Sequence, residues 1–226
     1  MHPVSRPLRR PAVPIARPQS VGEELANSLS HGIGFLGAVV SLPVLVSMAL
    51  RRGDATLDVV ACCVFSLTMM LLYLTSTVYH ALPDGRAKQV CNRLDHAAIY
   101  LFIAGSYTPF ALGALRGGLG WTLFGVIWTL ATLGMLAKLF NRLSHPLAST
   151  LLYVGMGWIA VFAAGPLMKQ VSATGVQLLI AGGVAYTLGA LVFLLDSRLR
   201  YAHFVWHLFV LGGSTCHFLA ALWRRG

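Results

Sequence analysis

The sequence contains little charge, and very little of that charge is acidic. Only 11% of the 226 residues are charged, and 7 acidic residues stand against 17 basic ones, which gives a formal net charge of +10. A soluble domain carries about twice this charge density. The basic residues flank long apolar runs, where they act as topology signals and contact anionic lipids. We therefore expect membrane lipids as partners and no nucleic acid.

Cysteine motifs and a secretory leader are also missing. The four cysteines form no CxxC pair, which argues against a zinc ribbon or a disulfide framework, and we interpret them as small buried hydrophobic residues. The first 20 residues are rich in Pro and Arg and lack the central apolar stretch of a signal peptide. We predict that residues 1–20 form a disordered basic cytoplasmic tail and that residues 21–226 form one transmembrane domain.

Long apolar runs make up most of the remaining chain, which is 57% hydrophobic with a mean hydropathy of +0.72. A membrane-spanning helix needs about 20 predominantly apolar residues, and seven runs are of this size. The predicted fold is therefore an all-α integral membrane protein, a bundle of seven transmembrane helices with short connections. The predicted spans are 31–50, 59–82, 94–115, 119–137, 147–168, 171–195 and 202–223.

The distribution of Lys and Arg predicts how the bundle is oriented. The tail and the connections after the second, fourth and sixth spans share one side of the membrane, and this side carries 11 of the 17 basic residues. Cytoplasmic segments are enriched in Lys and Arg. We predict a cytoplasmic N-terminus and an external C-terminus, although Arg51 and Arg52 on the external side weaken the asymmetry.

Several ionisable side chains fall inside or at the ends of the predicted spans, where they are costly and mark functional candidates. On the predicted topology, those at the cytoplasmic level are His31, His80, Asp95, His96, His203 and His207. His217 is placed about 21 Å further along the last span than His203, and we interpret it as a hydrogen-bonded core histidine. Because separate spans bring imidazole and carboxylate groups to one level, this level is the predicted site.

The spacing of the histidines indicates a metal site. His203 and His207 are four residues apart, so they share one face of a helix and could chelate one ion. The alternative is a pair of histidines that are hydrogen-bonded at a helix end. His80 would add a third imidazole, and three neutral imidazoles with an open fourth position are typical of catalytic zinc. His31 could be a further polar neighbour.

Asp95 and Ser76 are the candidate catalytic residues. Asp95 could act as a general base or orient a metal-bound water, whereas its structural alternatives are an ion pair with Arg93 or a helix cap. Ser76 lies one turn before His80 and could donate to a substrate oxygen, or it could bond to its own helix. The acidic pair Glu23 and Glu24 is explained by the dipole of the first helix alone.

These motifs resemble the hemolysin III proteins of bacteria, which belong with the progestin and adipoQ receptors and share their constellation with adiponectin receptors and alkaline ceramidases. The resemblance covers about residues 21 to 223. The matching motifs are Ser76-x3-His80, Arg93-Leu94-Asp95-His96, His203-x3-His207, Glu24-x2-Asn27-x3-His31, Gly105-Ser106-Tyr107-Thr108-Pro109 and Trp206-His207-Leu208-Phe209-Val210 followed by His217-Phe218.

The resemblance implies a seven-helix bundle in the bacterial inner membrane with a zinc ion in the inner leaflet. It assigns the metal ligands to His80, His203 and His207, the residue that holds the metal-bound water to Asp95, and the serine of the family motif to Ser76. Within residues 105–109 we expect a kink or close helix packing. Gly and Pro are tolerated in membrane helices where neighbouring helices satisfy the backbone groups that they leave unpaired.

Three functions are compatible with this reading. The leading hypothesis is a zinc-dependent intramembrane hydrolase of a lipid amide or ester, as the ceramide-hydrolysing relatives imply. The second is a non-enzymatic sensor or regulator of membrane state with structural zinc, and the third is the cytolytic or pore-forming activity of the family name. A retinal pigment is excluded because Lys88, Lys138 and Lys169 all lie at helix ends or in loops. A haem between His80 and His207 stays open.

Overall fold

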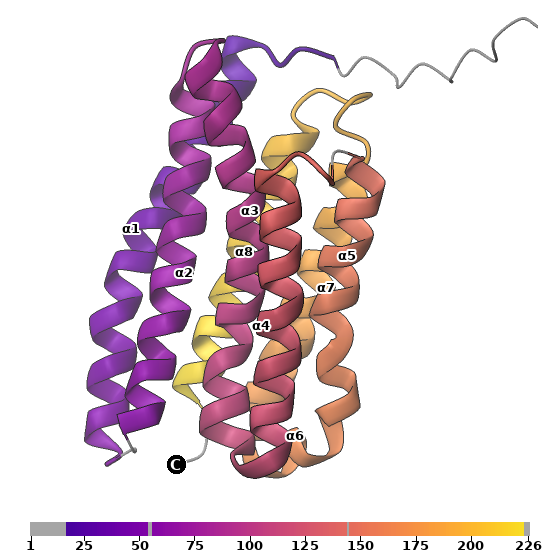
Figure 1. The fold of residues 1–226 in the computed structure, drawn as a ribbon. Helices are drawn as coiled ribbons and strands as arrows, with labels where there is room; N and C mark the ends of the chain where they lie inside the picture. The colour runs from indigo at the N-terminus through magenta and orange to yellow at the C-terminus, as the bar shows by residue number, and fades with distance from the viewer. Residues whose placement is uncertain (1–16, 54–55, 144, 224–226) are drawn as a thin grey trace, which may run out of the picture.

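The computed structural model describes residues 17–53, 56–143 and 145–223, which form an up-and-down bundle of helices (Figure 1). Seven helical segments are long and apolar enough to cross a membrane, as predicted, and the described residues contain no β-strand. The predicted disordered tail lies almost wholly outside the described residues. Five spans are single helices: α1 (Val21–Arg51), α2 (Thr56–Ala81), α4 (Gly117–Leu139), α7 (Ala173–Phe193) and α8 (Ala202–Leu222).

The third and fifth spans are built from more than one helical segment. In the third, α3 (Arg86–Thr108) passes into a π-helical segment, η1 (Pro109–Leu115). In the fifth, α5 (Pro146–Trp158), the 3-10 segment η2 (Ile159–Ala163) and α6 (Ala164–Gln170) follow one another. The motif at residues 105–109 therefore combines a change of helix type with close packing. A Cβ atom on Gly105 would lie 1.9 Å from the Thr68 hydroxyl of α2.

The first helix begins at Val21, ten residues earlier than the apolar run predicted. Ser20 caps it, and Glu23 completes a capping box by accepting hydrogen bonds from the Ser20 backbone N–H and hydroxyl. Glu23 and Asn27 are buried within the protein, which is why hydropathy alone missed this part of the helix. His31 consequently lies well inside α1 and does not open it.

The third helix also begins earlier than predicted, at Arg86 and not at Leu94. Its N-cap residue is Gly85, so the alternative that Asp95 caps this helix is wrong. Asp95 lies nine residues into α3, about 14 Å along its axis, and its side chain is buried. The first turns of α3 are polar, so a search for apolar runs does not detect them as part of the helix.

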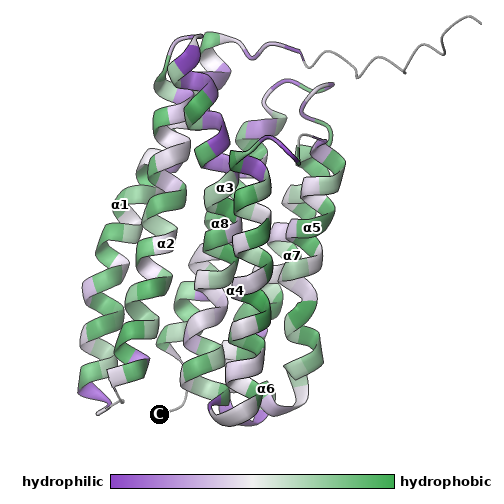
Figure 2. Ribbon diagram, in the orientation of Figure 1, coloured by the Kyte–Doolittle hydropathy of each residue, from purple (hydrophilic) through white to green (hydrophobic). Residues whose placement is uncertain are grey.

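Hydrophobic residues make up most of the length of the helices, and hydrophilic residues gather at the ends of the bundle, most clearly where α1 begins (Figure 2). Large hydrophobic residues are exposed on the spans, including Leu36, Leu71, Leu133 and Leu188. This surface needs a lipid environment to be stable. All four cysteines are unbridged. Cys62 is buried and the other three are half-buried, so the prediction that the cysteines are buried hydrophobic residues holds fully only for Cys62.

The starts of α1 and α8 and the end of α2 meet at one end of the bundle. Glu23 ties the first two together, because its carboxylate accepts a hydrogen bond of 2.8 Å from the Tyr201 backbone N–H at the N-cap of α8. Below this end, Tyr73 of α2 is hydrogen-bonded to Ser214 of α8. These contacts fix the helices that carry the candidate metal ligands.

Candidate metal centre

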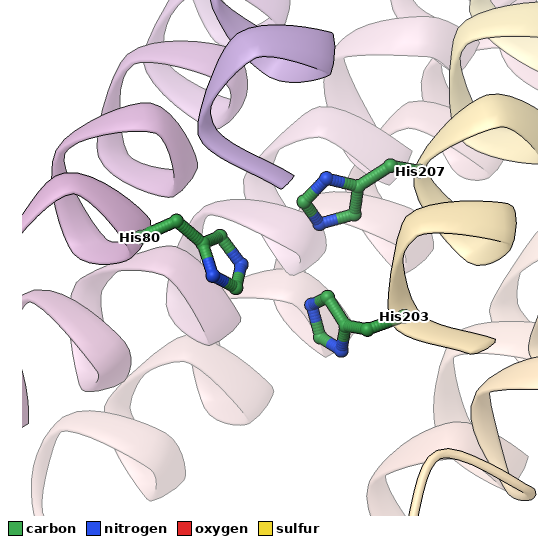
Figure 3. A group of neighbouring side chains, drawn as sticks. All are labelled: His80, His203 and His207. Atoms are coloured by element: carbon green, nitrogen blue, oxygen red, sulfur yellow. The ribbon is translucent and has the colours of Figure 1, made fainter. Parts of the chain in front are cut away.

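Three buried histidines from two helices converge near the end of the bundle. His80 lies in the last turn of α2, whereas His203 and His207 lie in the first two turns of α8. Their candidate ligand atoms all lie within 4.8 Å of one another, so the three residues could hold a metal ion. Figure 3 shows the three side chains pointing toward one another. Their rings meet edge to face, and the ring centroids lie 4.7 to 5.1 Å apart. The structure thus brings the three predicted ligands together.

Each imidazole is held by a hydrogen bond at its Nδ1 atom. The His80 Nδ1 atom lies 2.6 Å from the Glu24 carboxylate, and the His203 Nδ1 atom lies 3.1 Å from the Asp196 carboxylate. The His207 Nδ1 atom lies 3.2 Å from the Asn27 carbonyl oxygen. A carboxylate or carbonyl on one ring nitrogen fixes the tautomer that leaves the other nitrogen free to bind a metal.

The imidazole nitrogens that do not take part in these hydrogen bonds fit a metal site. The Nε2 atom of His80 is buried and has no hydrogen-bond partner, which is costly unless something binds it. Three imidazole nitrogens are a common zinc ligand set with an open fourth position. The spread of up to 4.8 Å is slightly wider than the ~4 Å that two Zn–N bonds can span. The three nitrogen atoms therefore lie slightly further apart than they would around a bound zinc ion.

Asp95 and Ser76 lie beside the histidines and line the same cavity as His203 and His207. The Asp95 carboxyl is close enough to interact with His203 and with the Ser76 hydroxyl. The Ser76 hydroxyl itself is fully buried and makes no hydrogen bond of standard geometry, so its predicted alternative of bonding to its own helix is not observed. Both candidate catalytic groups thus remain available to a ligand.

His31 and His96 extend the polar surroundings of the centre. The His31 ring stacks on His207, with centroids 3.5 Å apart and planes inclined by 8°, and neither of its ring nitrogens has a hydrogen-bond partner. His31 is therefore a neighbour of the centre, as predicted, even though its position in α1 differs. His96 lines the cavity, and its Nδ1 atom lies 2.9 Å from the Asn92 carbonyl of its own helix.

A cavity of about 280 Å³ runs from this centre into the apolar interior. Its lining is mostly aliphatic and aromatic, and Asp95 is its only charged residue among the described part of the chain. Part of the lining faces outward, since Val161, Met168 and Ile180 are each more than half exposed on α5–α7 segments. The cavity therefore reaches the lipid-facing surface beside α7 as well as the histidines.

Sequence reasoning missed the groups that hold the imidazoles. Glu24 lies in the first turn of α1, as the helix-dipole interpretation requires, but that interpretation is incomplete, because its carboxylate also contacts His80 and the Lys88 ammonium. Asp196 directly follows the predicted sixth span, where hydropathy assigns it no role, yet it contacts His203. Glu24, Asn27 and His31 recur at helical spacing in the sequence, and this periodicity was the signal that could have placed α1 correctly.

Comparison with known proteins agrees with this architecture. The sequence profile of the family described as Haemolysin-III related matches residues 19–218. "Hemolysin-3" of Bacillus cereus is 46% identical over 204 residues, which cover 90% of this chain and 92% of the relative. "Hemolysin-3 homolog" of Bacillus subtilis (strain 168) is 40% identical over 203 residues, covering 90% and 94%. The human "Monocyte to macrophage differentiation factor" is 28% identical over 214 residues, covering 89% and 84%.

The fold and the site define a multi-pass membrane protein with a cluster of three histidines that could hold a metal ion inside the bundle. With the profile match and the two Bacillus relatives, the chain belongs to the hemolysin III family, as its motifs predicted.

Proposed function

We propose that this protein is a zinc-dependent hydrolase that cleaves an amide or ester bond of a lipid within the bacterial plasma membrane. The observation that supports it is the placement of Asp95 and Ser76, both buried, at the end of an apolar cavity where it meets His203 and His207. A zinc ion held by His80, His203 and His207 would polarise the scissile carbonyl and activate water for attack.

The remaining steps fall to the chain's own groups. The Asp95 carboxylate accepts the proton of the attacking water and returns it to the leaving amine or alcohol. The Ser76 hydroxyl, which has no other hydrogen-bond partner, donates to the oxygen that becomes negative as the carbonyl is attacked. The apolar cavity holds the acyl chain and keeps bulk water away from the reacting bond.

The reach of the cavity to exposed α5–α7 side chains supports a lipid substrate. A lipid could enter sideways from the bilayer, with its chain on the apolar lining and its polar group toward Asp95. The names of the Bacillus relatives attach hemolysis to those proteins. A mostly apolar lining does not favour an aqueous pore for this chain.

The first test measures metal content by elemental mass spectrometry on detergent-purified protein, beside His80→Ala and His203→Ala. We expect near-stoichiometric zinc in the parent and its loss in both variants, because each removes one of three ligands. Absence of zinc from freshly purified, folded parent would sink the metal assignment. A Soret band in the same preparation would indicate haem instead.

The second test separates a hydrolase from a structural metal site. Asp95→Asn and Ser76→Ala should lower the rate of lipid amide hydrolysis by about 10²–10³-fold while zinc content stays unchanged. Ser66→Ala is the matched control, since Ser66 is a buried serine ten residues away on the same helix that bonds to Ser41. Zinc-loaded parent that cleaves no lipid amide or ester leaves the sensor with a structural metal as the better function.

A further inference from the structure

A second polar group faces the cavity far from the histidine cluster. His217 on α8 and Tyr186 on α7 both line the cavity. His217 follows His207 by ten residues, which places it about 15 Å further along α8. Both ring nitrogens of His217 and the hydroxyl of Tyr186 are buried and have no hydrogen-bond partner. The expectation of a hydrogen-bonded core histidine is therefore not met.

The two rings are fitted into the helix pair by glycines. A Cβ atom on Gly182 would lie 2.4 Å from the His217 ring, and one on Gly213 would lie 2.7 Å from the Tyr186 ring. Each helix thus offers a glycine one turn from its own aromatic residue to receive the ring of the other helix. The rings meet edge to face with centroids 5.3 Å apart. Their position follows from backbone shape, so the pair is held in place without polar contacts.

Neighbouring groups do not satisfy the pair. Ser214 lies near the Tyr186 hydroxyl but makes no hydrogen bond of standard geometry with it. The Ser214 hydroxyl is instead hydrogen-bonded to Tyr73 and donates to the Val210 carbonyl. The Leu179 backbone lies near the His217 ring without a hydrogen bond of standard geometry. Buried polar groups of native proteins are nearly always paired with protein, water or ligand. The unpaired nitrogen atoms of His217 and the Tyr186 hydroxyl are therefore suited to hydrogen-bond a ligand in the cavity.

The charge of the cavity restricts the class of this partner. No Lys or Arg lines it in the described part of the chain, and the single carboxylate, Asp95, lies at the other end. An anionic headgroup would be buried there without a counter-charge, which is costly. A neutral imidazole offers one donor and one acceptor, and a phenol offers both. A hydroxyl group complements them, because it too can donate and accept.

We propose that His217 and Tyr186 form a distal recognition site for a hydroxyl group on the chain of an uncharged lipid whose polar head lies at the histidine cluster. The choice of an amide as that head rests on the proposed function. The distal site itself rests only on the cavity, the unpaired atoms and the separation of about 15 Å along α8. It sets which lipid is preferred and takes no part in bond cleavage.

The test compares two neutral amides in the chelator-treated, full-length protein in detergent micelles: stearamide and a stearamide with one hydroxyl near mid-chain. Binding is titrated by native mass spectrometry, so it does not depend on hydrolysis. We expect the hydroxylated amide to bind about three- to tenfold more tightly, the worth of one net hydrogen bond. An isomer with its hydroxyl next to the carbonyl should show no such gain.

Tyr186→Phe and His217→Leu should each reduce or remove this preference while stearamide still binds. Ser106→Ala is the matched control, because Ser106 also lines the cavity but already donates to the Ile103 carbonyl. Tyr186→Phe removes one oxygen atom only and guards against an unfolded His217→Leu variant. Equal binding of the two amides in the parent, binding of neither, or a preference that survives both variants overturns the distal site. Zinc content and hydrolysis report separately on the proposed function.

Discussion

Glu24 and Asp196 act on the candidate metal centre through the histidines that they contact. Each carboxylate faces the Nδ1 atom of one imidazole. The Gln19 amide donates to Asp196 at 3.5 Å and accepts a hydrogen bond of 2.6 Å from the Asn27 amide. A carboxylate at this position makes the opposite nitrogen a better ligand and fixes the ring. Glu24 lies in the first turn of α1 and Asp196 in the connection between α7 and α8, so the centre depends on both segments.

Removal of either carboxylate should weaken metal binding without removing a ligand. We expect Glu24→Ala and Asp196→Ala to lower zinc affinity by about 10–100-fold, the usual effect of losing such a partner. Competition with a chromogenic chelator measures this affinity. Asp84→Ala is the control, because Asp84 is an exposed carboxylate at the same end of the bundle. Parent-like affinity in both test variants would contradict this role. If thermal unfolding then occurs at a lower temperature than in the parent, the carboxylates only hold the helices together.

The elements show which parts of the fold could be read from the sequence. Apolar runs predicted all seven spans, because lipid-facing length is a strong signal. They misplaced the starts of α1 and α3, because the first turns of both helices are polar. In α1 these polar residues include the buried Glu23 and Asn27, whereas the first two turns of α3 contain no buried residue. The capping box of Ser20 and Glu23 is visible in the sequence and marks the true start of α1. The approach of α8 to α1 and α2 could not be derived from spacing, since side-chain packing decides it.

Small residues set how closely the helices pack, and α4 contains a matched pair that tests this. A Cβ atom on Gly134 would lie 2.4 Å from the buried Tyr100 ring, whereas one on Gly125 would meet nothing within 4 Å. Gly134→Ala should destabilise the bundle by about 1–3 kcal/mol through overpacking. Gly125→Ala should be neutral or stabilising by up to about 1 kcal/mol through helix propensity. Thermal unfolding in one detergent compares the two, and equal shifts would contradict the packing argument.

At the scale of the whole molecule, seven spans place the start of α1 and the end of α8 at opposite ends of the bundle (Figure 1). The candidate metal centre lies near the end where α1 begins, among the polar residues of that end. The residue types of the centre were predicted from the sequence, because imidazole and carboxylate stand out in apolar spans. The cavity was not, because its shape depends on how α3, α5, α7 and α8 pack together.

The orientation of the bundle decides which compartment supplies water and metal to the centre. Because most basic residues lie on the side of the N-terminus, we expect that side, and the centre with it, to face the cytoplasm. Alkaline phosphatase fused after the C-terminus should be active in a bacterial host, and a green fluorescent protein there should be dark. The same reporters inserted at Ser197, between α7 and α8, should give the reverse pattern. Fluorescence from the C-terminal fusion with phosphatase activity at Ser197 would place the centre in the outer leaflet, where external metal would load it.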